Sequence, residues 1–178
     1  MPKARIEKEA KMLLSEEEFA ALCSLRDFTV TTQINHYYQG NANCAVRIRE
    51  FPDSGKLLFT LKERIPGGHR EYEKEIPENN FLDPYVQEVL QQFGLDEPLY
   101  LGDLLTVRHL YRGKSGEICL DEDHYLGITD YEFEFELYDA DSGSYEEGFA
   151  FLKEAGLNYR ENRISKLKRF LDAKNEKS

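Results

Sequence analysis

The chain has 178 residues and a formal net charge of −11, with 32% charged and 40% hydrophobic residues. This length can supply one domain with a sizeable core. The acidic balance argues against a general nucleic-acid-binding protein, which normally carries an excess of positive surface. No apolar run approaches the length that spans a bilayer, so we expect no membrane segment.

The first residues and the cysteines favour a cytoplasmic location. Residues 1–5 run into charged sequence without the apolar core of a secretory signal. Cys23, Cys44 and Cys119 are an odd number at wide spacing, which is not the pattern of a disulfide framework. The four histidines are scattered as well, so we expect no metal site built from histidine and cysteine.

Taken in chain order, alternating or β-branched and aromatic residues predict about eight strands. The expected strands are residues 4–13, 28–38, 44–51, 56–64, 69–76, 99–112 (one or two strands), 117–122 and 128–138. Helices are expected over residues 15–25, from Asn79 or Asn80 to about residue 93, and over residues 145–156 and 162–172, the first opened by a capping box of Ser15 and Glu18. This order predicts an α+β protein: an eight-stranded antiparallel closed β-barrel with peripheral helices, in a single domain over residues 1–178.

Charged residues alternate within these strands and are sorted by sign. The acidic sets are Glu7 with Glu9, Glu71 with Glu73 and Glu75, and Glu132 with Glu134 and Glu136; the basic sets are Arg47 with Arg49, Lys62, and Arg108 with Arg112. The opposite positions are largely apolar, as in Val46 and Ile48. If the apolar face packs against a shell of core and the sheet closes, the charged face lines the interior of the barrel.

A charged interior predicts a charged ligand, because a buried charge without a partner costs several kcal/mol. Arginine and lysine would bind phosphate oxygens, and carboxylates would hold Mg²⁺ or Mn²⁺. The alternative is that each charged face is solvated on an open sheet and is stabilised by cross-strand ion pairs.

The charged motifs follow one another in a defined order. They are Glu7-Lys8-Glu9-Ala10-Lys11, Val46-Arg47-Ile48-Arg49, Thr60-Leu61-Lys62, Arg70-Glu71-Tyr72-Glu73-Lys74-Glu75, a strand with Arg108, Leu120-Asp121, Tyr131-Glu132-Phe133-Glu134 and Ser165-Lys166. This order resembles the CYTH family of triphosphate tunnel metalloenzymes, whose signature is E-x-E-x-K. The family includes thiamine triphosphatases, inorganic triphosphatases and class IV adenylyl cyclases. The segment before Glu7 lacks the histidine that the cyclase branch tends to carry, which counts against the cyclase interpretation. The sequence is more similar to the small bacterial members of the family, which are usually labelled cyclase or phosphatase.

The resemblance implies one tunnel domain that hydrolyses inorganic triphosphate, thiamine triphosphate or a nucleoside triphosphate with Mg²⁺ or Mn²⁺. It implies substrate binding by Lys11, Arg47, Arg49, Lys62, Arg108, Arg112 and Lys166, metal binding by Glu7, Glu9, Asp121, Glu132 and Glu134, and catalytic roles for Lys11, Glu71 and Glu73. A solvated position near the rim remains open for Glu75, Glu136 and Arg112.

The expected partner is a small-molecule triphosphate, with no nucleic acid and no membrane, in a monomer or a homodimer. Two alternatives stay open: a class IV-type adenylyl cyclase, and a non-catalytic module that binds polyphosphate or a phosphorylated metabolite.

Overall fold

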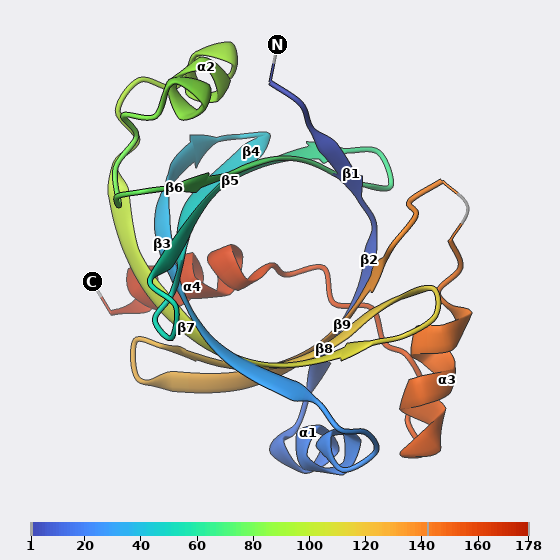
Figure 1. Ribbon diagram of the computed structural model, residues 1–178. Helices are drawn as coiled ribbons and strands as arrows, with labels where there is room; N and C mark the ends of the chain where they lie inside the picture. Colours follow the sequence, from blue (N-terminus) through green and yellow to red (C-terminus); the bar gives the residue numbers. More distant parts are fainter. Residues whose placement is uncertain (1, 142, 178) are drawn as a thin grey trace. The chain divides into compact units, whose positions relative to one another are not determined.

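The computed structural model describes residues 2–141 and 143–177, and in these ranges the chain forms nine strands and four helices (Figure 1). The strands are β1 (Arg5–Glu7), β2 (Glu9–Leu14), β3 (Thr29–Asn41), β4 (Cys44–Phe51), β5 (Lys56–Ile65), β6 (Gly68–Ile76), β7 (Tyr100–Arg112), β8 (Gly116–Tyr125) and β9 (Ile128–Leu137). The helices are α1 (Glu16–Cys23), α2 (Pro84–Gln92), α3 (Glu146–Glu154) and α4 (Lys166–Glu176). The predicted α+β class is confirmed, with nine strands in place of about eight.

The strands form one sheet in the order β1-β6-β5-β4-β3-β7-β8-β9-β2. Its two edge strands are consecutive in the chain and only Lys8 separates them. β1 pairs antiparallel with β6, and β2 pairs antiparallel with β9. The sheet is therefore an antiparallel barrel that is closed except at one seam. The single strand predicted over residues 4–13 is two strands, because the backbone exchanges β6 for β9 as its partner after Glu7.

Backbone contacts divide the chain into two compact units. The first comprises Met1–Glu7 and Gln33–Leu104, and the second comprises Lys8–Thr32 and Leu105–Ser178. The single domain expected over residues 1–178 stays a prediction.

The core of the first unit lies between one face of β4, β5 and β6 and the helix α2. Ile48 and Phe59 are fully buried there and belong to one cluster with Val89 of α2. The Asp83 carboxylate caps α2 by accepting hydrogen bonds from two backbone N–H groups. With Pro84 at the first helical position, this cap sets the start of the helix four or five residues later than predicted.

The core of the second unit lies between one face of β2, β8 and β9 and the helices α1 and α3. Met12 and Phe133 are fully buried in one cluster with Leu22 of α1 and Phe151 of α3. The predicted capping box at Ser15 is present and opens α1. Because the apolar side chains of the strands point toward these helices, the charged side chains of the same strands lie on the other face of the sheet.

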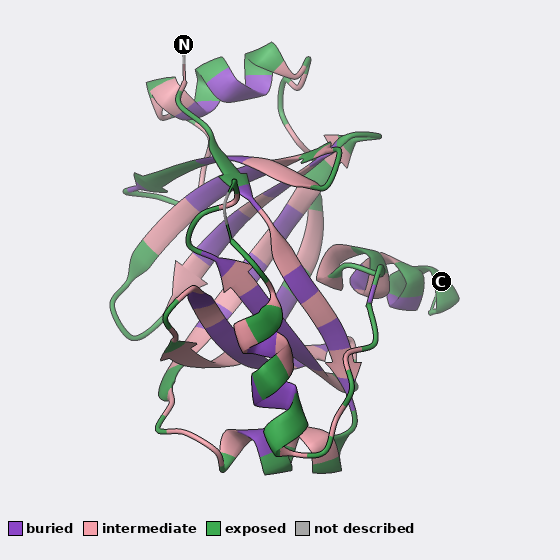
Figure 2. Ribbon diagram, turned by 90° about the vertical axis from the view of Figure 1, so that its right-hand side faces the viewer, coloured by how far each residue is buried: buried purple, intermediate pink, exposed green. Residues whose placement is uncertain are grey.

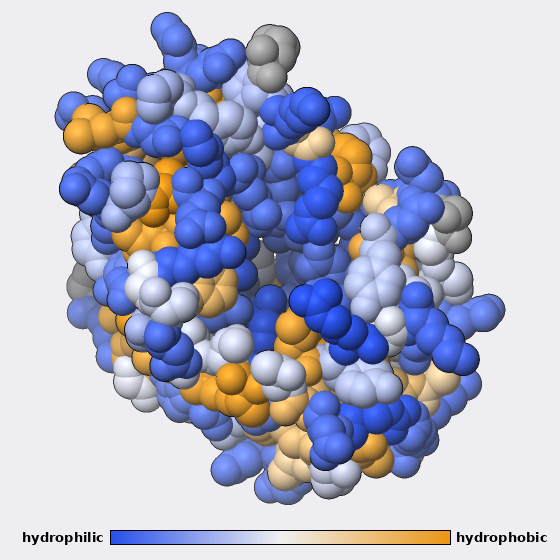
Figure 3. All heavy atoms as spheres, viewed as in Figure 1, coloured by the Kyte–Doolittle hydropathy of each residue, from blue (hydrophilic) through white to orange (hydrophobic). Residues whose placement is uncertain are grey.

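Burial alternates along the strands in keeping with this two-faced arrangement (Figure 2). The face drawn in Figure 3 is mostly hydrophilic, with hydrophobic residues in separate groups. Over residues 2–141 and 143–177, the helices are too short or too polar to cross a bilayer.

Candidate active site

The charged face of the first unit is built by β1 and β4 to β6. Lys62 Nζ lies 2.9 Å from a carboxylate oxygen of Glu7 and 3.2 Å from one of Glu71. Arg5 donates to the other oxygen of Glu71 at 2.9 Å. Opposite register positions on neighbouring strands explain this pairing, since Lys62 faces Glu71 across β5 and β6 and Arg5 faces Glu71 across β1 and β6.

Glu71 is held as a carboxylate although it is buried. Burial raises its pKa, but a hydrogen bond with Glu7 and the charges of Lys62, Arg47 and Arg5 together bring the pKa well below its usual range. A carboxylate with so low a pKa is a weak base. In this unit Glu71 therefore fixes the positions of the neighbouring cations.

Two arginines follow each other on the same face of β4. Arg49 Nε donates to Asn35 Oδ1 on β3 at 2.8 Å, and both side chains are buried. The Nε atom of Arg47 is also buried, and no described residue accepts a hydrogen bond from it. A buried donor without an acceptor is costly, and an anion oxygen is a strong acceptor for a guanidinium.

The charged face of the second unit gathers three carboxylates around Lys166, the first residue of α4. Its Nζ lies 2.9 Å from Asp121, 2.7 Å from Glu132 and 2.5 Å from Glu134. Arg108 of β7 binds both oxygens of Asp121 at 2.8 Å and one oxygen of Glu134 at 3.1 Å. The three predicted metal ligands on β8 and β9 are thus brought together, and two predicted phosphate-binding cations neutralise them.

The pKa shifts of these carboxylates follow from burial and from the two cations. Burial raises the pKa of Asp121 and of Glu134, but Arg108 and Lys166 outweigh it and bring both values below their usual range. Burial raises the pKa of Glu132 and dominates there despite Lys166. At neutral pH this cluster therefore holds at least two carboxylates in the ionised form.

A second cation of α4 anchors the helix to the same face. Arg169 donates to Asp130 at 3.1 Å and to Asp123 and Glu132 at 3.3 Å. Asn162, before the helix, donates to the same Glu132 at 2.6 Å. These contacts place α4 against the charged face of β8 and β9.

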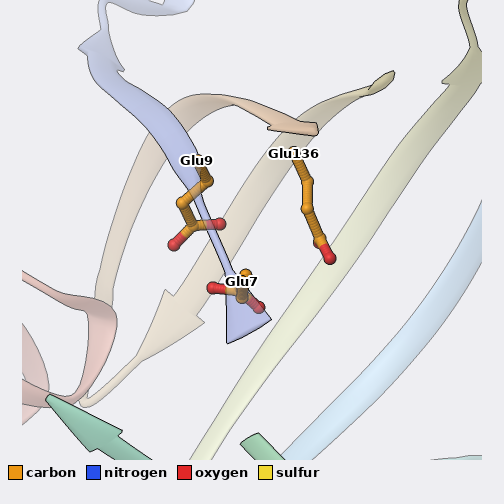
Figure 4. Close-up of side chains that lie close together, drawn as sticks. All are labelled: Glu7, Glu9 and Glu136. Atoms are coloured by element: carbon orange, nitrogen blue, oxygen red, sulfur yellow. The ribbon is translucent and has the colours of Figure 1, made fainter. Parts of the chain in front are cut away.

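A third group of carboxylates surrounds the start of β2. Glu9 lies opposite Glu136 of β9, and Glu7 precedes Glu9 by two residues. Each of the three offers an oxygen within 4.8 Å of the others (Figure 4). Carboxylate oxygens without nitrogen or sulfur ligands are the donor set that Mg²⁺ and Mn²⁺ prefer, so these residues fit the expected metal.

A family model of the CYTH domain matches residues 5–171. The chain belongs to the CYTH family. It is 32% identical over 155 residues to YjbK, a proposed triphosphatase of Bacillus subtilis (strain 168), across 78% of this chain and 80% of that protein.

Two solved structures share the CYTH fold with this chain over nearly its whole length. A proposed adenylate cyclase from Bacillus halodurans is 28% identical with a TM-score of 0.79, covering 94% of this chain and 98% of its own. HpAC1 from Hippeastrum, a proposed adenylyl cyclase described as having a dominant triphosphatase activity, is 25% identical with a TM-score of 0.68, covering 94% of this chain and 95% of its own.

Lys11 lies beside the second-unit cluster, since it faces Glu134 in the register of β2 and β9 and its charge lowers the pKa of Glu132 and of Glu134. Glu73 and Arg112, which were also predicted from the CYTH resemblance, lie outside these clusters. Lys11 Nζ lies 3.9 Å from Glu9, and Glu73 accepts a long hydrogen bond of 3.5 Å from the Thr60 hydroxyl. The Arg112 side chain is 75% exposed, and its guanidinium lies 3.6 Å from a carboxylate oxygen of Glu117. This exposure is consistent with the alternative of a solvated position near the rim. The roles of all these residues remain predictions.

Several residues of the charged faces were not found by sequence reasoning: Arg5, Asn35, Asp123, Asn162 and Arg169. Two of them carried a usable signal. Asp123 continues the alternation begun by Asp121, and Arg169 lies one turn after Lys166 on the same helix face.

Asp123 gives the chain a testable pH dependence. It is fully buried and accepts a hydrogen bond from the Thr106 hydroxyl at 2.6 Å. Burial is the largest effect and raises its pKa to about 8, against the lowering by the charge of Lys166 and by the Thr106 hydrogen bond; the charges of Asp121 and Glu132 act in the same direction as burial. A carboxyl whose pKa is raised on folding stabilises the fold fully below its unfolded pKa, and this contribution is lost as the pH rises through the folded pKa.

We therefore expect Asp123→Asn to gain stability relative to the wild type as the pH rises from 5 to 9, since asparagine imitates the neutral acid at every pH. Urea unfolding at several pH values measures the difference. Asp53→Asn, at an exposed position, is the matched control and should follow the wild-type pH dependence. A constant difference between Asp123→Asn and the wild type across this range would contradict the raised pKa.

Proposed function

We propose that this CYTH protein hydrolyses a triphosphate with the aid of Mg²⁺ or Mn²⁺. The observation that carries the proposal is the buried Nε of Arg47, which no described residue satisfies and which lies on the same strand face as Arg49. A non-bridging phosphate oxygen supplies the missing acceptor.

Binding of the phosphates is assigned to the cations of the charged faces. In the first unit these are Arg47, Arg49 and Lys62. In the second unit Lys11, Arg108 and Lys166 have this role, and Arg112 is assigned to an outer position. Arginine binds two phosphate oxygens at once and lysine acts as a point charge, so the two residue types hold a polyanion without a covalent intermediate.

The metal is assigned to Glu7 and Glu9 together with Glu136, and Asp121, Glu132 and Glu134 are retained as further ligands. Held by these carboxylates, Mg²⁺ or Mn²⁺ would supply positive charge to the phosphate oxygens. In the second unit the two assignments are coupled, because Arg108 and Lys166 contact the same carboxylates that the proposal gives to metal.

The catalytic roles are divided among Lys11, Glu71 and Glu73. Glu71 keeps Lys62 and Arg5 in place as a permanent carboxylate. Glu73 is exposed and is proposed to orient the attacking water. Lys11 is proposed to bind phosphate or to hold Glu9, the group beside it.

Two of the three relatives named above support hydrolysis over cyclisation, and the third, from Bacillus halodurans, is a proposed adenylate cyclase. YjbK is a proposed triphosphatase, and the related HpAC1 is described with a dominant triphosphatase activity although it is a proposed cyclase. We further propose that the protein acts in the cytoplasm on a small molecule, and not on nucleic acid or a membrane.

A substrate panel tests this proposal. Inorganic triphosphate, thiamine triphosphate and ATP are each incubated with the chain and Mg²⁺ or Mn²⁺, and released phosphate and cyclic AMP are measured separately. We expect phosphate release that EDTA abolishes and no cyclic AMP. Cyclic AMP as the main product would establish the cyclase, and tight binding without turnover in either metal would establish a non-catalytic binding module.

A further inference from the structure

An asparagine on β3 lies among the arginines of the first unit. Asn35 faces Arg49 in the register of β3 and β4, and the neighbouring pair in the same register is Tyr37 with Arg47. Side chains at alternate positions of a strand share a face, so Asn35 lies on the charged face with both arginines. Asn35 is 0% exposed, although asparagine side chains are mostly exposed in folded proteins. Its amide oxygen has a hydrogen-bond partner among the described residues, but its amide nitrogen has none.

The orientation of the Asn35 amide is fixed by its neighbour. Arg49 Nε can only donate, so the atom of Asn35 that lies 2.8 Å from it is the oxygen. The amide nitrogen then points away from Arg49 with two N–H donors. No described residue accepts from this buried nitrogen, and the same holds for Arg47 Nε.

Unpartnered buried polar atoms are therefore concentrated on one part of this face. Two of them, Asn35 Nδ2 and Arg47 Nε, are donors, and the Oε1 atom of Gln33, two residues before Asn35, is an acceptor. Buried polar groups are nearly always hydrogen-bonded, so donors left without acceptors indicate a bound group that brings acceptors with it. Beside two guanidinium groups that group is an anion.

We propose that Asn35 is a further substrate-binding residue, whose Nδ2 donates to a non-bridging oxygen of the phosphate chain while its Oδ1 holds Arg49 toward the same anion. This inference rests on the proposed function for the identity of the anion. It assigns to Asn35 a role that charge alone does not reveal, since the side chain is neutral.

Two substitutions separate the donor from the acceptor of Asn35. Asn35→Asp keeps an oxygen for Arg49 and replaces the donor with a negative oxygen, whereas Asn35→Ala removes both. If Asn35 contacts the phosphate, the affinity for triphosphate falls about 100-fold below the wild type in Asn35→Asp and about 10-fold in Asn35→Ala. If Asn35 only positions Arg49, the order is reversed, because the aspartate retains the contact with Arg49.

The experiment is a calorimetric titration with inorganic triphosphate in the absence of divalent metal, so that binding is measured apart from hydrolysis. Asn79→Asp is the matched control: it makes the same charge change at an exposed site of the same unit and keeps the oxygen that accepts from Tyr38. It should bind like the wild type. Thermal unfolding of each variant identifies loss of fold, and Asn35→Asp is expected to fold because Arg49 pairs with the new carboxylate.

The outcomes separate the two proposals. Weaker binding by Asn35→Asp than by Asn35→Ala supports the Asn35 contact. Equal binding by the two variants, the reverse order, or a wild-type chain that binds no triphosphate overturns it. A wild-type chain that binds triphosphate with the expected order of variants but releases no phosphate with either metal overturns the proposed hydrolysis and leaves the Asn35 contact standing.

Discussion

Arg47→Ala is expected to lower kcat/KM for triphosphate hydrolysis by about 10²–10³-fold. The guanidinium has a buried Nε that no described residue satisfies, and its charge is one of the three that hold Glu71 as a carboxylate. The free energy of unfolding should change little, because Lys62 and Arg5 still pair with Glu71 and the loss of an unsatisfied donor offsets the lost charge. Phosphate release and urea unfolding measure the two effects.

Arg70→Ala is the control for Arg47→Ala. Arg70 lies on β6 in the same unit, but the alternation of that strand puts it on the face opposite Glu71, where it pairs with Glu63 at 2.8 Å. A partly exposed pair on the opposite face lies away from the proposed site, so activity should stay within about 3-fold of the wild type. Equal losses in the two variants would mean that general charge, and not the charged face, determines activity.

Lys166→Met is expected to destabilise the fold by about 3–5 kcal/mol and to abolish hydrolysis. Its ammonium lies within 3 Å of Asp121, Glu132 and Glu134, and its side chain is only 11% exposed. Without this cation three buried carboxylates face one another, with Arg108 still paired with Asp121 and Glu134 and Arg169 still paired with Glu132. Their folded-state pKa values should then rise, so the loss of stability should be smaller at pH 5 than at pH 8.

Lys168→Met is the matched control on the same helix. The Lys168 side chain is 63% exposed and pairs with Asp172 one turn later at 2.9 Å. Its replacement should cost less than about 1 kcal/mol at either pH. If urea unfolding showed that Lys166→Met lowers the free energy of unfolding no more than Lys168→Met does, the ion pairs between Lys166 and the buried carboxylates would not stabilise the fold.

The two-faced character of the strands could be predicted from the sequence because the period of a strand is two residues. Alternation alone puts Arg47 and Arg49 on one side of β4 and Val46 and Ile48 on the other, and the core clusters confirm the apolar side. Turn and cap signals likewise predicted most helices, since the Ser15 capping box depends only on residues three apart.

Other features depend on which strands become neighbours, and the sequence does not carry that information locally. The seam after Glu7 arises because the backbone changes partner from β6 to β9, whereas the local pattern runs on without interruption. Asn35 has no charge to mark it and acquires its place through register with Arg49. The ion pairs of Lys166 require α4 to pack against β8 and β9. This is a contact between segments that are distant in the sequence, and local sequence patterns do not indicate it.

The charge balance of the second unit adds a constraint to the proposal. Arg108 and Lys166 are assigned to phosphate, yet they already neutralise the carboxylates assigned to metal. If both assignments hold, an arriving phosphate competes for the two cations, and the released carboxylates become available to a metal. Substrate and metal would then bind with positive cooperativity in this unit.

The most direct test of the central claim is phosphate release from inorganic triphosphate by EDTA-treated protein to which Mg²⁺ or Mn²⁺ is returned. The wild type is compared with Glu9→Gln and Arg49→Ala, one variant for the acidic group at β2 and one for the basic face of β4. We predict activity that depends on added metal in the wild type and is lost in both variants. Full activity in both variants, or activity that persists in EDTA, would contradict metal-dependent hydrolysis on the charged faces.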